Sequence, residues 1–275
     1  MNDPVSDTRK ILITGGTSGL GLGLVRFFLG KGYFVTATGR KNVKVQDLAG
    51  RFTFLKTDFS DMRQTSDAVR RICRDHEFDI VINNAGVLSP PGFMLTADGN
   101  EYTFQVNFLS HLMLNEIVLR NTPPDRPLKI AAIVSPVYRI AKKDLIICSS
   151  KADYSPLKAY SNSKLYLALM CTWLPVKYSS RDLKCIAFDP GVFSSGIYRM
   201  QKEWFRMLYR VAAPFMRSPE KITGKFGEII EKKDLVYGVV YKSGDKIRSV
   251  PGIENDRVDA FWTECYKMIE PYLGT

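Results

Sequence analysis

Residues 10–21 read KILITGGTSGLG, and this stretch decides the fold that the sequence predicts. Lys10–Thr14 is a short run of β-forming residues, Gly15–Gly21 is a glycine-rich turn, and Leu22–Leu29 continues as an apolar helix. A glycine turn between a first strand and a first helix lets the backbone approach a pyrophosphate, which the free N–H groups of the helix N-terminus can bind. The turn has no lysine of the kind that a Walker ATP-binding loop needs. A turn like this also occurs merely to pack a strand against a helix.

The alternation of strand and helix continues along the chain. Further strands are expected at 33–38, 51–56, 78–82, 128–134 and 183–188, with helices at 61–74, 101–119 and 160–174. Such βα units predict an α/β fold with a doubly wound parallel sheet. No internal repeat, low-complexity linker or change of composition divides the sequence, so residues 1–275 are expected to form a single domain.

Composition narrows the class of protein. The 275 residues are 45% hydrophobic and 24% charged, which is typical of a folded globular protein and excludes wholesale disorder. Every apolar run is too short for a membrane span, and Asp3 and Asp7 disfavour a signal peptide, so the cytoplasm is the expected location. The five cysteines show no CxxC spacing, and His76 and His111 are the two histidines. This leaves little material for a zinc site or a Ser-His-Asp triad, and no metal site is expected.

The formal net charge of +11 is compatible with nucleic acid, an anionic membrane surface or an anionic cofactor. One basic pair has a place in the predicted site. No acidic residue occurs between Thr14 and Gln46, and Arg40 and Lys41 follow the second strand. At this place an acidic residue would bind the ribose 2′-hydroxyl of NAD, whereas an arginine accommodates the 2′-phosphate of NADP. The pair therefore favours NADP, unless it is only a solvated basic turn.

Two further segments carry candidate chemistry. Asn83-Asn84-Ala85-Gly86 follows a buried strand and would lie at the carboxyl edge of the sheet, where ligands of open α/β folds bind, although a plain turn has similar residues. Tyr160 and Lys164 are spaced i,i+4 and would share one helix face. The ammonium would then lower the pKa of the phenol and make the tyrosine a usable acid. A YxxxK spacing is common by chance, so neither segment is decisive alone.

The order of the segments along the chain carries more weight than any one of them. They are Thr14–Gly21, Asn83–Gly86, Asn107, Ser135, Tyr160 with Lys164, and Pro190-Gly191. They resemble the TGxxxGxG, NNAG, serine, YxxxK and PG signatures of the short-chain dehydrogenase/reductase family, over nearly the whole chain. Residues 96–114 and 218–221 look like its retinol dehydrogenase and protochlorophyllide reductase branch. The resemblance implies a Rossmann fold.

The resemblance also implies roles for particular residues. Tyr160 would be the general acid, Lys164 would tune it and hold the nicotinamide ribose, Ser135 would bind the developing alkoxide, and Asn107 would order a proton-relay water. Asp58 would lie near the adenine, or would instead cap the helix that begins near Asp61. The implied cofactor-binding residues are Thr14, Gly15, Thr17, Ser18, Gly19, Leu20, Gly21, Arg40, Lys41, Asp58, Phe59, Asn83, Ala85, Gly86, Tyr160, Lys164, Pro190, Gly191, Val192 and Ser194.

The sequence departs from the family pattern near the predicted catalytic serine. Val134 stands where a first serine is usual, Pro136 follows Ser135, and Asp189 replaces a residue that is often histidine. Because Ser135 matches the second serine of the usual pair, the departures bear on the identity of the substrate rather than on catalysis.

Residues 196–217 follow the Pro-Gly segment, at the place where the resemblance puts a substrate lid. Apolar side chains recur there at helical spacing, while Arg199, Lys202, Arg206 and Arg210 recur on another face. This pattern predicts either an ordinary surface helix or a helix whose apolar face closes over a bulky lipophilic or aromatic substrate, with its basic face in water or against anionic lipid. The expected lid residues are Met200, Trp204, Leu208 and Phe215.

These observations predict an NADPH-dependent oxidoreductase that interconverts a ketone or aldehyde and an alcohol on a lipophilic or aromatic substrate. A homodimer or homotetramer is expected, with weak contact to a membrane surface as an option. The main alternative is a catalytically silent NADP-binding sensor or scaffold, which would not need a tyrosine at the spacing that tunes its acidity. A nucleic-acid binder is a weaker alternative, because no recognised nucleic-acid module is present.

Overall fold

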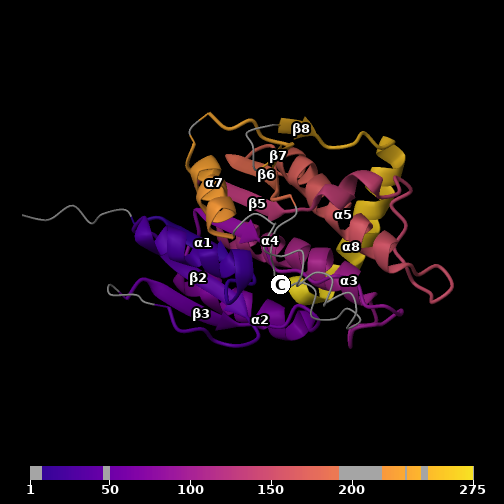
Figure 1. The fold of residues 1–275 in the computed structure, drawn as a ribbon, viewed down its shortest axis with the longest axis horizontal. Helices are drawn as coiled ribbons and strands as arrows, with labels where there is room; N and C mark the ends of the chain where they lie inside the picture. Colours follow the sequence, from indigo (N-terminus) through magenta and orange to yellow (C-terminus); the bar gives the residue numbers. More distant parts are fainter. Residues whose placement is uncertain (1–7, 46–49, 192–218, 233, 243–246, 275) are drawn as a thin grey trace, which may run out of the picture.

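The computed structural model describes residues 8–45, 50–191, 219–232, 234–242 and 247–274. Its centre is an eight-stranded sheet with the order β3-β2-β1-β4-β5-β6-β7-β8 (Figure 1). The strands are β1 (Lys10–Ile13), β2 (Phe34–Gly39), β3 (Phe52–Lys56), β4 (Ile80–Asn83), β5 (Leu128–Ile133), β6 (Leu183–Asp189), β7 (Val239–Lys242) and β8 (Ile247–Ser249). The predicted parallel sheet is confirmed as far as β7, whereas the edge strand β8 pairs antiparallel with β7. Too few residues separate these two strands for a parallel crossover.

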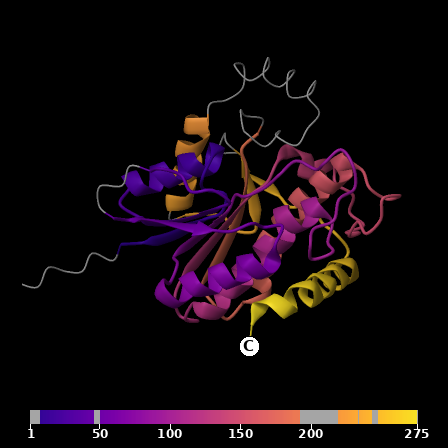
Figure 2. The same ribbon diagram turned by 90° about the horizontal axis from the view of Figure 1, so that it is seen from below.

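Helices cover both faces of the sheet. They are α1 (Gly19–Gly30), α2 (Met62–Asp75), α3 (Tyr102–Phe104), the π-helical η1 (Gln105–Leu109), α4 (Ser110–Asn121), the 3₁₀ turn η2 (Pro136–Ile140), α5 (Pro156–Lys177), α7 (Pro219–Glu231) and α8 (Asn255–Leu273). The apolar core on one face comes from α1 and α7, and that on the other from α2, α4, α5 and α8. Figure 2 shows α8 as an outer layer over the second group. The arrangement is the predicted doubly wound α/β fold.

The strand order reverses at β1, which pairs with β2 on one side and with β4 on the other. In open α/β sheets, such a switch point leaves a crevice outside the carboxyl ends of the strands, where ligands bind. The backbone N–H of Thr14 continues the pairing by donating to the Ile82 carbonyl at 3.0 Å. The glycine turn after β1 and the segment after β4 are therefore neighbours, although they are far apart in the sequence.

The helix boundaries differ from the sequence predictions at three places. Asp61, not Asp58, caps α2, because its carboxylate accepts the Gln64 N–H at 2.8 Å. The capping role considered for Asp58 is therefore wrong. The helix expected at 101–119 contains the π-helical segment η1, and the helix expected at 160–174 runs from 156 to 177. Helix α5 begins earlier than expected, at Pro156. Proline suits the first turn of a helix because the backbone N–H groups there have no partner within the helix.

The predicted lid, with Met200, Trp204, Leu208 and Phe215, lies outside the described residues, as do Val192 and Ser194. The roles expected for these residues stay predictions. Among the helices of the described part of the chain, none is long and apolar enough to cross a lipid bilayer.

Candidate active site

The glycine turn is packed tightly on one side and open on the other. A Cβ atom on Gly15 would lie 2.9 Å from the Ala85 Cα, and one on Gly21 would lie 2.2 Å from the Gly15 carbonyl oxygen. Gly15 and Gly19 also have left-handed backbone angles, with φ of 64° and 51°. Within the described part of the chain, and apart from the neighbouring residues and its own helix, no atom lies within 4 Å of a Cβ position on Gly19. Among the residues that the structure describes, the turn therefore leaves open space at the N-terminus of α1, which fits the predicted pyrophosphate site.

Hydrogen bonds fasten this turn to the segment after β4. The Thr14 hydroxyl oxygen accepts the backbone N–H groups of Asn84 at 2.8 Å and Ala85 at 2.9 Å. The Asn84 side-chain amide donates to the carbonyls of Thr14 at 2.9 Å and Gly15 at 3.3 Å. Asn84 was not among the residues selected from the sequence, although it lies within the selected NNAG segment. Its side chain helps to fix the shape of the turn.

Some predicted cofactor residues have their side chains in the core. Asn83 is fully buried, and its amide donates to the Asn115 side chain at 3.3 Å. Leu20 and Phe59 are also buried, the latter with its ring edge-on to His111 at 4.8 Å between ring centroids. These three side chains are therefore buried and not exposed at the carboxyl edge of the sheet. In a cofactor site they would act through the backbone or through packing.

Lys164 is buried at the carboxyl end of β5. Its ammonium donates to the Ile133 carbonyl at 3.0 Å, and it lies 5.9 Å from the centroid of the Tyr160 ring. Burial lowers the pKa of Lys164 to about 8. Ser135 follows two residues after Ile133, and within the described part of the chain its hydroxyl forms no hydrogen bond. Three of the predicted catalytic residues therefore gather around the end of one strand.

Asn107 lies close to this group but uses its side chain for support. Its side-chain oxygen Oδ1 accepts the Val87 N–H at 2.7 Å. Its side-chain NH₂ group donates to the Val87 carbonyl at 2.9 Å and to the Ser163 hydroxyl at 3.1 Å. A Cβ on Gly86 would lie 3.3 Å from Asn107 Oδ1 and 3.4 Å from Lys164 Nζ, so glycine permits their close approach. Because both amide N–H groups are engaged, the Asn107 amide has no donor left for the predicted relay water.

The neighbouring strand contributes Pro190 and Gly191, which directly follow β6. Gly191 has a φ of 73°, and its N–H donates to the Asp189 carboxylate at 2.9 Å. Asp189 is 3% exposed, and burial raises its pKa. The residue that departs from the family pattern thus shapes the backbone turn at this end of the site.

Arg40 and Lys41 are exposed just beyond β2, on the other side of the glycine turn. The end of β2 touches that turn, because a Cβ on Gly39 would lie 2.8 Å from the Thr17 side chain. The charges of Arg40 and Asp58 both act on Tyr102, whose pKa is raised chiefly by burial. Tyr102 is not predicted from the sequence, since a single tyrosine at the start of a helix carries no distinct signal. The fold brings it within electrostatic reach of two predicted cofactor residues.

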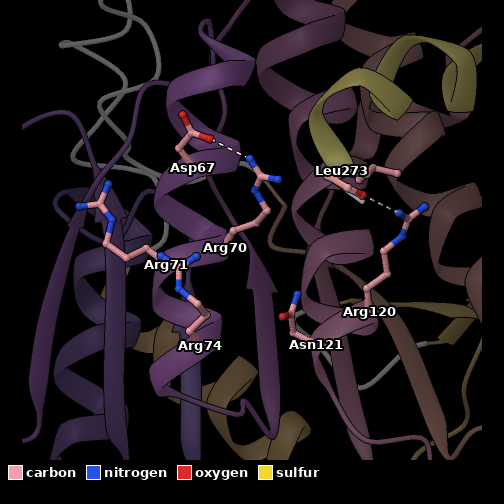
Figure 3. A pocket seen from close by; sticks show the side chains of 8 residues that line it. Asp67, Arg70, Arg71, Arg74, Arg120, Asn121 and Leu273 are labelled. Atoms are coloured by element: carbon pink, nitrogen blue, oxygen red, sulfur yellow. Dashed lines mark hydrogen bonds and ion pairs between the residues drawn. The ribbon is translucent and has the colours of Figure 1, made fainter.

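A separate cavity of about 700 Å³ lies between the C-terminal ends of α2 and α4, at the opposite edge of the sheet (Figure 3). Its cations are Arg70, Arg71, Arg74 and Arg120, of which only Arg70 is not exposed. Arg70 forms an ion pair with Asp67 at 2.9 Å, and Arg120 donates to the Gly274 carbonyl at 3.5 Å. Of the residues predicted for the active site, none that the structure describes lines this cavity.

Known proteins match this chain over most of its length. The family model of the short chain dehydrogenases matches residues 9–206. Polyprenol dehydrogenase of Homo sapiens is 27% identical over 212 residues, covering 71% of this chain and 64% of that protein. Retinol dehydrogenase 12 of Homo sapiens is 27% identical over 220 residues, covering 76% of this chain and 69% of that protein. The chain thus spans about two thirds of the length of these relatives.

A solved structure of an uncharacterized protein from Mycobacterium Paratuberculosis has a TM-score of 0.71 and 23% sequence identity, and covers 95% of this chain and 93% of that chain. This likeness concerns the fold alone.

Proposed function

The chain belongs to the short chain dehydrogenase family, and we propose that it is an NADPH-dependent oxidoreductase that interconverts a carbonyl group and an alcohol. The observation that carries the proposal is the buried ammonium of Lys164, placed between the end of β5 and the Tyr160 ring. Lysine is almost never fully buried in an ordinary core. A buried lysine with a lowered pKa beside a tyrosine, at the ligand-binding edge of an α/β sheet, is suited to proton transfer.

The glycine turn fits a nicotinamide dinucleotide. Within the described residues there is open space beside Gly19, and the N–H groups of the first turn of α1 have no partner inside the helix, which suits a pyrophosphate. The first turn of α1 also has no acidic residue to repel one. In the proposal this turn holds the pyrophosphate, while Lys164, Pro190 and Gly191 lie toward the nicotinamide. A nicotinamide cofactor supplies the hydride when it is bound.

The chain's own residues handle the proton and the charge. Tyr160 donates a proton to the substrate oxygen during reduction and takes it back during oxidation. The ammonium of Lys164 stabilises negative charge on the phenol oxygen. The Ser135 hydroxyl donates a hydrogen bond to the substrate oxygen, where negative charge develops. Asn107 holds the segment after β4 by two hydrogen bonds to Val87 and thereby fixes the position of this segment in the site.

The preference for NADPH is supported by charge. Arg40 and Lys41 stand where the ribose 2′-position is expected, and the sequence has no acid there to bind a hydroxyl. Arg40→Asp should lower the ratio of NADPH to NADH affinity by about tenfold or more, since charge-assisted hydrogen bonds contribute about 1.5–3 kcal/mol. Fluorescence titration with both cofactors measures this ratio. Arg74→Asp, an equal change of charge at the opposite edge, is the matched control and should leave the ratio unchanged; equal ratios in the two variants would contradict the assignment.

The proposed substrate is a lipophilic or aromatic carbonyl or alcohol. Two relatives are named for polyprenol and retinol, which are both lipophilic alcohols. The apolar residues predicted for the lid point to the same class. The in vitro test is NADPH oxidation against ketones, aldehydes, steroids, retinoids and aromatic polyketides, with Tyr160→Phe as the control for each active compound. Tight NADPH binding without turnover of any class would favour a sensor or scaffold instead.

A further inference from the structure

His111 is a fully buried histidine that has no part in the proton transfer proposed above. It lies on α4, one helical turn after Asn107. Its Nδ1 atom is 3.0 Å from the Asn107 backbone carbonyl oxygen, and its Nε2 atom is 3.0 Å from the Thr14 hydroxyl. The ring thus spans the distance between the helix that carries Asn107 and the strand that leads into the glycine turn.

The chemistry of the partners fixes the tautomer of His111. A backbone carbonyl only accepts hydrogen bonds, so Nδ1 must carry the proton and donate to Asn107. Nε2 is then an acceptor for the Thr14 hydroxyl proton at 3.0 Å, which is nearer than the Ile82 carbonyl oxygen, the second acceptor of that hydroxyl at 3.3 Å. The oxygen of that hydroxyl accepts the N–H groups of Asn84 and Ala85. One directed chain of hydrogen bonds therefore runs from the segment after β4, through Thr14 and His111, to Asn107.

The ring is neutral and confined. Burial and the charge of Lys164 lower the pKa of His111 to about 3, so it neither titrates near neutral pH nor acts as an acid or base there. The Phe59 ring packs edge-on against it. Asn107 lies within η1, where the helix is locally π-helical and the Ser110 N–H donates to the Gln105 carbonyl. π-Helical turns are rare and concentrate at functional sites.

We propose that His111 is a positioning residue that couples the glycine turn to Asn107, so that the cofactor-binding turn and the proton-transfer group hold a fixed relation. The inference rests on the proposed function. Asn107 in turn supports Val87 and approaches Lys164 across Gly86. Loss of the hydrogen bond between His111 and Thr14 should loosen the glycine turn. Loss of the hydrogen bond between His111 and Asn107 should loosen the segment beside Lys164 that Asn107 supports.

The test uses two variants that each keep one half of the ring's bonding. In His111→Asn the amide N–H replaces Nδ1–H, but nothing reaches Thr14. In His111→Gln the longer side chain brings an acceptor toward Thr14. We expect His111→Asn to raise the Kd for NADPH about threefold to tenfold with kcat nearly kept, and His111→Gln to lower kcat about threefold to tenfold with Kd nearly kept. General destabilisation would change both quantities together in both variants, and that result would overturn the proposal.

Two further measurements keep the proposal falsifiable. Nitrogen-15 NMR of the His111 ring should show the neutral Nδ1–H tautomer from pH 5 to 8; an Nε2–H tautomer, or titration in this range, would overturn the hydrogen-bond chain whether or not a substrate is known. His76→Asn, at the other histidine, is the control and should leave both Kd and kcat unchanged. If the His111 variants keep the Kd for NADPH and the kcat of the wild type, the coupling is refuted. A wild-type protein that binds no dinucleotide would instead refute the proposed function.

Discussion

The carboxyl edge of the sheet and the arginine-lined cavity at the opposite edge look alike in charge but differ in construction. At the carboxyl edge the polar groups of Thr14, Asn107 and Lys164 are buried, and each has partners in fixed directions. In the cavity most of the arginines are exposed; Arg70 pairs with Asp67, and Arg120 donates to the backbone carbonyl of Gly274. Exposed ion pairs contribute little free energy. We therefore base the proposed site on buried, directed polar contacts and not on the volume of a cavity.

The largest expected effect tests whether the carboxyl edge does the chemistry. Tyr160→Phe removes the proton donor and keeps the ring, so kcat should fall about 10²- to 10⁴-fold on any substrate that the wild type turns over. The Kd for NADPH should change far less. Steady-state kinetics and fluorescence titration measure the two quantities. Near-normal turnover would show that the acid lies elsewhere and would break the comparison.

The next effect is the dependence of stability on pH that the buried Lys164 produces. Burial lowers its pKa to about 8 in the folded protein, from the ordinary lysine value of 10.5. Between these values the unfolded chain binds the proton that the folded protein has lost, so this group makes stability rise with pH. The free energy of unfolding of the wild type, relative to Lys164→Met, should increase by at most about 3 kcal/mol from pH 8 to pH 10.5. Urea denaturation at several pH values checks the sign, and a flat or falling difference would contradict it.

A steric test compares a tightly packed glycine of the turn, Gly21, with a glycine that has room for a side chain, Gly30. Gly21→Ala puts a methyl group 2.2 Å from the Gly15 carbonyl oxygen, so it should destabilise the fold by about 1–3 kcal/mol and weaken NADPH binding. Gly30→Ala, at the other end of α1, meets no atom of another described segment within 4 Å and serves as the control. Its unfolding midpoint should be equal to or above that of the wild type. Equal stabilities for the two variants would mean that the turn tolerates a side chain.

The smallest expected effect concerns the arginine-lined cavity at the opposite edge of the sheet. Arg74→Ala in the opposite cavity removes an exposed guanidinium for which the structure gives no hydrogen bond within its described residues. We expect the free energy of unfolding to change by less than about 0.5 kcal/mol, with kcat and the Kd for NADPH unchanged. Thermal unfolding and the same kinetic assays measure this. A loss of activity would mean that the opposite edge communicates with the site.

Much of the fold was predictable because hydrophobic periodicity is local. The βα alternation through β6 and the glycine turn are confirmed in their predicted places. The pairing of β8 and the docking of α8 on α4 were not foreseen, because both depend on contacts between distant segments. The π-helical turn at Gln105–Leu109 has no distinct sequence signal, since the same apolar residues suit an α-helix.

The site was predictable as a set of motifs but not as a set of contacts. The resemblance implied Thr14, Asn107 and Lys164 as site residues, with Thr14 among those that bind the cofactor. In the structure the Thr14 hydroxyl oxygen accepts the backbone N–H groups of Asn84 and Ala85. Asn83 was selected for the cofactor, and its side chain instead bonds to Asn115 in the core. Adjacent residues in a motif point to opposite sides of a strand end, and only the fold decides which of them faces the ligand.

The pairing of β1 with β4 also has a consequence for how the protein is made. The hydrogen bond between Thr14 and His111 joins residues 97 positions apart, and those between Thr14 and Asn84 span 70 positions. The chain is synthesised from its N-terminus, and contacts at such separations form slowly because long loops must close first. A ribosome-bound chain that ends before Ile80 contains the whole glycine turn but lacks the strand and the amides that hold it. We therefore expect nascent chains to gain NADPH affinity only after His111 has left the exit tunnel, which stalled chains of graded length would reveal.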